Sequence, residues 1–146
     1  MKFKSRKDFL FTAILILILV GLLYFNILIF LDEEESLVSK IGFSVLNFLI
    51  TGLLIWIYFG THYKLKDEFF YYNSGPIKGK IPISSIRKIQ HPKTLFVGIL
   101  KPATALNGLI IFYNKFDEIY ISPDSNEKFV EAILKLNPKI EIEKNS

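Results

Sequence analysis

Two long apolar runs dominate the first part of the chain. Residues 9–31 and 41–59 contain no Asp, Glu, Lys or Arg, and the acidic run Asp32–Glu35 lies between them. At about 1.5 Å per residue, helices of these lengths span roughly 35 and 28 Å, and the hydrocarbon core of a bilayer is about 30 Å thick. The pattern therefore predicts two transmembrane helices, and Ser39 is the expected N-cap of the second.

After Gly60 the apolar positions change to an alternation with period two, which is typical of β-strands. This pattern predicts strands over 61–66, 69–73, 77–83 and 86–91, followed by a hairpin of 109–113 and 116–122 across the turn Asn114–Lys115. A helix follows, because Asp124 and Glu127 have the spacing of a capping box and an apolar stripe runs from residue 129 to 136. Asn137–Pro138 ends it.

These elements predict an α+β membrane protein in which an N-terminal two-helix transmembrane hairpin precedes an antiparallel β-sandwich or partial barrel with one C-terminal helix. The hairpin occupies residues 1–60, the β-rich domain residues 61–138, and a tail the last residues, 139–146.

The distribution of charge orients the hairpin. Residues 1–8 carry a net charge of +3, residues 32–40 carry −3, and residues 61–146 carry +4. Since Lys and Arg at the ends of spans stay on the cytoplasmic side, both termini are expected in the cytoplasm. A cleaved signal peptide is the alternative for residues 1–25, but the apolar run continues through Gly21 without a small-residue cleavage site. The chain has no Cys, which excludes disulfides and a lipid anchor on Cys.

Asn26 and Asn47 interrupt the two spans at similar expected depths, five and six residues from their outer ends. Two amides at one depth can form an interhelical hydrogen bond, so a bond between Asn26 and Asn47 is a candidate contact. Each amide could instead bond to backbone or to interfacial water. Neither span contains an ionisable side chain, which argues against an ion or proton path.

Three segments carry a resemblance to a known family: FGTHYKLKD, SGPIKGKIPISSIRKI and IFYNKFDEIYISPDSNEKFVEAIL followed by LNP. Together with the paired spans, they resemble the YyaB-like bacterial pleckstrin-homology (PH) domain family over almost the whole chain. The resemblance implies a membrane-anchored PH-like domain in the bacterial cytoplasmic membrane, with no catalytic residues to assign. The chain departs from the family at Asn107–Gly108, where an Asp-Arg pair is common. The short, half-acidic loop Lys66–Glu68 does not favour inositide recognition.

No pattern for catalysis or cofactor binding is found. The segment GPIKGK has three residues between its glycines and no Ser or Thr after its last Lys, so it does not match a phosphate-binding loop. His62 and His91 have no Cys and no acidic cluster at metal-ligand spacing. We therefore predict a protein that is not an enzyme and has no cofactor, no metal and no nucleic-acid partner.

Two surfaces are candidates for binding. If the first strands form a meander, one face collects four lysines that could contact anionic lipid: Lys64, Lys66, Lys78 and Lys80. An ordinary solvated face is the alternative. An apolar segment could contact a partner or the membrane, or form a core strand; its residues are Leu95, Phe96, Val97, Ile99 and Leu100.

The function that we expect is non-catalytic binding or scaffolding of a protein partner at the membrane, with membrane lipid and self-association through the spans as further contacts. Two alternatives stay open. The protein could act through its spans in immunity or stress protection, or its basic face could sense anionic lipid.

Overall fold

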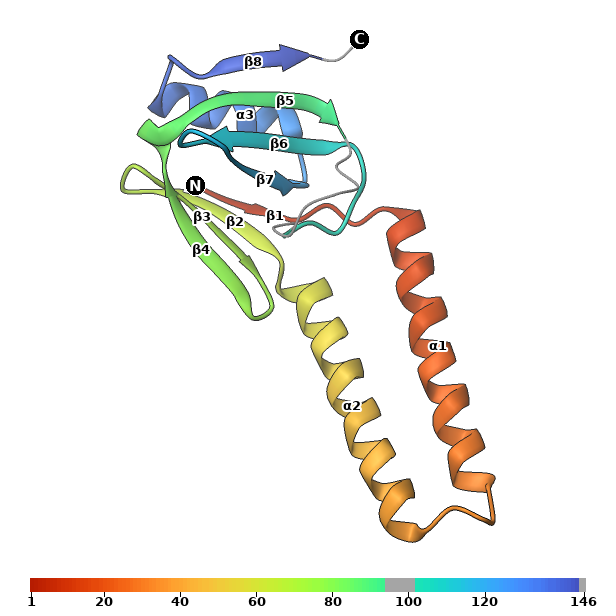
Figure 1. Ribbon diagram of the computed structural model, residues 1–146. Helices are drawn as coiled ribbons and strands as arrows, with labels where there is room; N and C mark the ends of the chain where they lie inside the picture. The colour runs from red at the N-terminus through yellow and green to blue at the C-terminus, as the bar shows by residue number, and fades with distance from the viewer. Residues whose placement is uncertain (94–101, 145–146) are drawn as a thin grey trace.

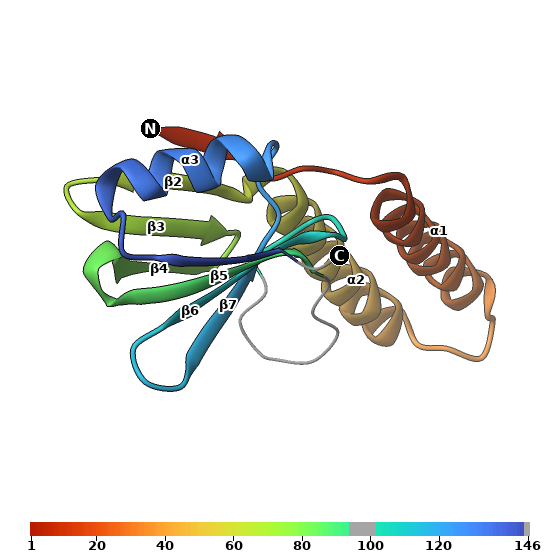
Figure 2. The ribbon, with the colours of Figure 1, turned by 90° about the horizontal axis from the view of Figure 1, so that it is seen from above.

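A computed structural model describes residues 1–93 and 102–144, and the side chains of residues 92 and 93 are left out of the description. Two four-stranded sheets and a helix form one domain, and two long helices extend from its side (Figures 1 and 2). The predicted α+β class, with an N-terminal helical hairpin followed by antiparallel strands and a C-terminal helix, is therefore confirmed. The predicted contact segment at residues 95–100 lies outside the described residues.

The long helices are α1, Phe9–Leu31, and α2, Leu37–Gly60. Both are long and apolar enough to cross a membrane, and most of their large apolar side chains are exposed. Asp8 caps α1 by accepting a hydrogen bond from Phe11 N at 2.7 Å. The predicted cap of α2 at Ser39 is wrong, because Ser36 Oγ accepts from Ser39 N at 3.1 Å and α2 begins one turn earlier.

That earlier start corrects the expected bond between Asn26 and Asn47. In the antiparallel register of the hairpin, Asn26 lies opposite Ser44 and donates to Ser44 Oγ at 3.2 Å. Asn47 lies one turn further along and donates to Leu22 O at 2.8 Å. Each amide makes an interhelical bond, but the two amides do not bond to each other, because the depths were counted from the wrong helix start.

The first sheet has the antiparallel order β1-β2-β3-β4. Its strands are β1 Lys2–Lys4, β2 His62–Lys66, β3 Phe69–Ser74 and β4 Ile77–Pro82. The second sheet has the order β7-β6-β5-β8, with β5 Ile86–Lys93, β6 Gly108–Tyr113, β7 Asp117–Ile121 and β8 Glu141–Lys144. The 3₁₀ turn η1, Ile83–Ser85, connects the two sheets between β4 and β5.

The structure adds one strand to the predicted domain, residues 61–138, from each side of it in the sequence. Strand β1 precedes the hairpin and pairs with β2, so that the two long helices are an insertion between neighbouring strands of one sheet. Residues 139–146 are not only a tail, because β8 pairs with β5 in parallel, with Ile142 opposite Ile89. Both segments add an edge strand, which requires a partner far away in the sequence.

The core lies between the sheets and under helix α3, Asn126–Leu136. Phe70 of β3 packs edge-on against Phe129 of α3 at 5.5 Å between ring centroids, and Phe3 of β1 does the same at 5.2 Å. The cap of α3 is Ser125 and not Asp124, since Ser125 Oγ accepts from Lys128 N. The β6–β7 turn has three residues and not two, which leaves Phe116 at its tip 84% exposed.

The end of α2 is fixed to the domain by the β3–β4 turn. Gly75 in this turn has φ +57°, and a Cβ there would lie 2.7 Å from Ile57 Cγ1 of α2. Thr61 Oγ1 and Ser74 Oγ lie 2.9 Å apart below the turn. Only a glycine therefore allows the turn to pack directly on the helix.

Candidate functional site

The outward face of the first sheet, which we call the lysine face, is the candidate binding site. Side chains alternate across a strand, so every second residue of β1, β2, β3 and β4 points away from the core. Six of these outward residues are lysines: Lys2, Lys4, Lys64, Lys66, Lys78 and Lys80.

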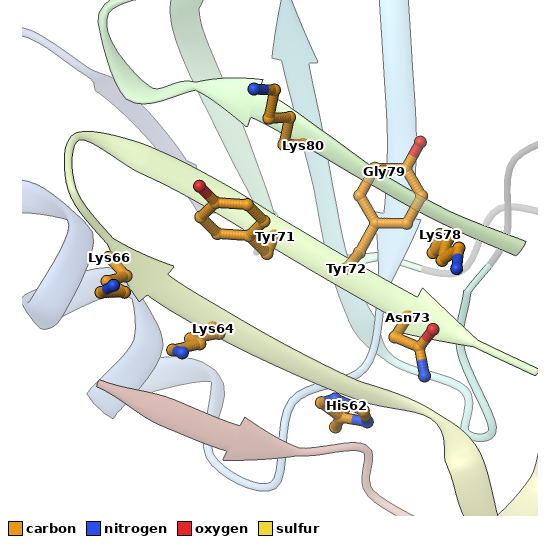
Figure 3. Close-up of a pocket in the computed structure, with 9 residues that line it drawn as sticks. All are labelled: His62, Lys64, Lys66, Tyr71, Tyr72, Asn73, Lys78, Gly79 and Lys80. Carbon is orange, nitrogen blue, oxygen red and sulfur yellow. The ribbon is translucent and has the colours of Figure 1, made fainter.

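The pairing register places these lysines in rows across the sheet. One row contains Lys2, Lys64, Tyr71 and Lys80, each opposite the next. The four predicted lysines of β2 and β4 are brought together as expected, and they line one pocket of about 570 Å³ (Figure 3). Whether they contact lipid stays a prediction.

The row nearest to α2 contains Lys4, His62, Asn73 and Lys78. Two of its side chains bind the last carbonyl of the helix. His62 Nδ1 lies 2.8 Å from Gly60 O, and Asn73 Nδ2 donates to the same oxygen at 3.1 Å. Because a carbonyl can only accept, Nδ1 of His62 carries the proton. The end of α2 and the lysine face therefore form one rigid unit.

The positive charge of the lysine face is almost uncompensated. Lys66 pairs with Asp67 at 2.9 Å, and this hydrogen bond to the carboxylate raises the Lys66 pKa. In the described ranges no carboxylate lies within 4.0 Å of the amines of the other five lysines. Lys80 Nζ instead lies 4.9 Å above the Phe69 ring. A face with this field attracts an anionic ligand.

Lys2, Lys4, His62, Tyr71 and Asn73 were missed as members of the site. The segment KFK at residues 2–4 has the same alternation as the later strands, and its apolar member Phe3 is 9% exposed. That alternation was the available signal. The basic flank of a transmembrane helix explains the same lysines without a strand.

A second polar cluster, which we call the hydroxyl cluster, joins the segment before α1 to the domain. Ser5, Tyr63 and Ser122 are buried, and Ser5 Oγ lies 2.9 Å from Ser122 Oγ and 3.2 Å from the Tyr63 hydroxyl. Thr104 Oγ1 donates to Ser5 Oγ at 2.9 Å. The described residues place no His, Asp or Glu in hydrogen bonds with these hydroxyls. These hydrogen bonds join the segment before α1 to β2 and to the segments that carry Thr104 and Ser122.

Burial raises the pKa of Tyr63, the central member of the hydroxyl cluster. The cause is desolvation of the phenolate, which outweighs the hydrogen bonds from Ser5 and Ser122 that favour it. Within the part of the chain that the structure describes, no group of three or more His, Cys, Asp or Glu side chains could hold a metal ion.

Comparisons with known proteins agree with this architecture. Residues 61–137 match the bacterial PH domain family. The chain is also 25% identical over 140 residues to the uncharacterized protein YyaB of Bacillus subtilis (strain 168), covering 96% of this chain and 95% of that protein. No solved structure gives a significant match.

Proposed function

Because the chain belongs to the bacterial PH domain family, we propose that it is a two-pass membrane protein whose cytosolic domain binds a partner protein without catalysis. The lysine face is the binding surface, and its ligand is an acidic segment of the partner. The observation that carries this proposal is a lysine-lined pocket at the end of a helix long enough to span a membrane.

Membrane insertion is supported by the exposure of the hairpin. The core helix of a soluble protein would be buried, but Phe48 of α2 is 78% exposed and Leu17 of α1 is 72% exposed. Because β1 and β2 are neighbours in one sheet, both ends of the hairpin lie on the same side of the membrane. The positive charge at residues 1–8 and 61–146 favours the cytosolic side of a bacterial cytoplasmic membrane.

The height of the lysines supports a protein ligand over a lipid. Strand β2 leads away from the end of α2 (Figure 1). At about 3.3 Å per residue, Lys64 and Lys66 lie up to about 13 and 20 Å beyond Gly60. The field of an anionic leaflet decays within a Debye length of about 8 Å. The row of Lys4 and Lys78 therefore lies nearest to the headgroups, and Lys64 and Lys66 are better placed for a ligand from the cytosol.

Crosslinking and affinity capture from native bacterial membranes tests this proposal. The variant Lys64→Glu/Lys80→Glu should recover the partner about ten- to thirtyfold less well, because two exposed ion pairs of up to about 1 kcal/mol each are lost and replaced by repulsion. The matched control is Lys128→Glu/Lys135→Glu, which changes the net charge equally at exposed positions of α3, outside the lysine face. Equal recovery by both variants contradicts the proposal.

The lipid alternative is tested in parallel. Full-length protein without the partner is reconstituted with phosphatidylcholine alone or with added phosphatidylglycerol, and the labelling rate of the lysine-face amines is measured. Under our proposal added phosphatidylglycerol protects Lys78 more than Lys66. Equal protection of both lysines, together with no protein captured from membranes, would support lipid sensing instead.

A further inference from the structure

We propose that two copies of this chain pair inside the membrane through a polar groove on the hairpin. The groove has a volume of about 470 Å³ and lies along one side of the contact between α1 and α2. Its polar wall is Asn26, Ser44, Asn47 and Thr51. The pairing rests on membrane insertion, but it does not depend on what the lysine face binds.

The groove lies at a depth where water is absent. Asn47 is the eleventh residue of α2, so at about 1.5 Å per residue it lies roughly 15 Å from the start of the helix. Because Lys40 lies in the first turn of α2, the apolar run begins beyond it, and Asn47 lies about 10 Å inside a hydrocarbon core of about 30 Å. Polar groups at this depth cannot bond to lipid tails, and those without a protein partner are costly.

Hydrogen bonds within the hairpin use only some of the donors and acceptors of this polar wall. Asn26 and Asn47 each use one amide N–H in the bonds to Ser44 Oγ and Leu22 O. Each amide has a second N–H and a carbonyl oxygen. Across residues 1–93 and 102–144 no hydrogen bond is formed by the Thr51 hydroxyl or by the side-chain carbonyls of Asn26 and Asn47.

These groups are self-complementary, which favours a second copy as the occupant. An amide and a hydroxyl each donate and accept, and a two-fold axis places a patch opposite itself. Each inserted copy supplies the matching amides at the matching depth, whereas a lipid tail supplies none. Interhelical bonds of this kind contribute to association in membranes.

The groove also allows a close approach. Gly52 follows Phe48, which lines the groove, by one turn of α2, and a Cβ at Gly52 would have no atom within 4 Å. The space beside Gly52 is therefore open. Small residues at such positions let the backbones of two membrane helices come together.

Single-cysteine crosslinking of the full chain in its own membranes tests the pairing, and the natural chain has no Cys. Phe48→Cys should give a covalent dimer with a short bifunctional maleimide. Leu46→Cys is the control, since Leu46 is 54% exposed on the other side of α2. Adding Gly52→Leu to Phe48→Cys should abolish the dimer without affecting the monomer. Equal dimer yield from Phe48→Cys and Leu46→Cys, or an adduct whose mass is not twice that of the chain, overturns the proposal.

The variant Thr51→Val tests the pairing without changing the hydrogen bonds between α1 and α2 of one copy. Loss of one interhelical bond should raise the dissociation constant in vesicles, measured by energy transfer between labelled copies, about three- to twentyfold. An unchanged constant contradicts the assignment of the polar wall. Insertion itself is reported separately by labelling Glu34→Cys in intact cells with an impermeant maleimide, so a failed pairing and a failed insertion give different results.

Discussion

The variant Tyr63→Phe removes one buried oxygen from the hydroxyl cluster and leaves the ring in the core. Tyr63 is fully buried, and its hydroxyl donates to Pro102 O and accepts from Ser122 N at 3.0 Å. Without the oxygen, the Pro102 carbonyl and the Ser122 amide lose these partners. Ser5 and Ser122 keep their mutual bond at 2.9 Å.

The expected loss follows from the two orphaned groups. A buried polar group without a partner costs about 1–3 kcal/mol, so we expect the two together to lower the free energy of unfolding by about 2–6 kcal/mol. That is a large part of the 5–15 kcal/mol that is typical of small domains. For a domain of about 100 residues, the melting temperature falls by at least about 8 °C.

Urea unfolding of the full chain in detergent, followed by the near-UV circular dichroism of its tyrosines, measures this loss. The control is Tyr71→Phe, which removes the same atom from the lysine face, where the described residues give its hydroxyl no hydrogen bond. Tyr71→Phe should change the free energy of unfolding by less than about 0.5 kcal/mol. If the two variants unfold alike, the hydroxyl cluster does not hold the N-terminal segment. Hydrogen exchange of residues 3–6 supplies a local readout and should accelerate only in Tyr63→Phe.

Two further predictions concern pH and packing. The pKa of Tyr63 is raised above its ordinary value near 10, so this tyrosine ionises first in the unfolded chain. Its contribution to stability should therefore be complete below about pH 10 and fall as the pH rises further. In an alkaline urea series, the free energy of unfolding should fall less steeply for Tyr63→Phe. A Cβ at Gly108 would lie 2.1 Å from Ile121 O. Gly108→Ala should therefore prevent normal pairing of β6 with β7 and lower the melting temperature. Gly42→Ala is the control, because its Cβ has open space, and it should leave the melting temperature unchanged.

Short-range sequence patterns predicted the elements whose formation depends on residues close together in the chain. The bounds of α1 at Phe9 and Leu31 follow from an uninterrupted apolar run. Strand β2 follows from the alternation of its residues, and β3, after the turn Asp67–Glu68, follows from its aromatic residues. The shared face of the four predicted lysines also follows, because consecutive antiparallel strands with short turns have a fixed register. No long-range information is needed for any of these.

The remaining parts depend on contacts distant in sequence. Strand β1 has three residues, and its partner Tyr63 lies sixty positions after Phe3, beyond the entire hairpin. Strand β8 is mostly charged, and it is recognisable only through the packing of Ile142 beside Ile89. The prediction of where α2 starts failed for a different reason. Ser36 and Ser39 are both good caps, and choosing the second shifted every depth in α2 by one turn.

The insertion of the hairpin between β1 and β2 determines how the domain is held. A domain joined to a helix by one linker can turn about it, but this domain is joined at two places. Residues 1–8 are fixed by β1 and the hydroxyl cluster, and Lys7 Nζ lies 4.4 and 4.0 Å above the rings of Tyr58 and Phe59 at the end of α2. The other connection passes through Thr61 directly into β2. With both connections this short, rotation of the domain would break sheet pairing. The orientation of the lysine face relative to the two long helices is therefore a property of the fold.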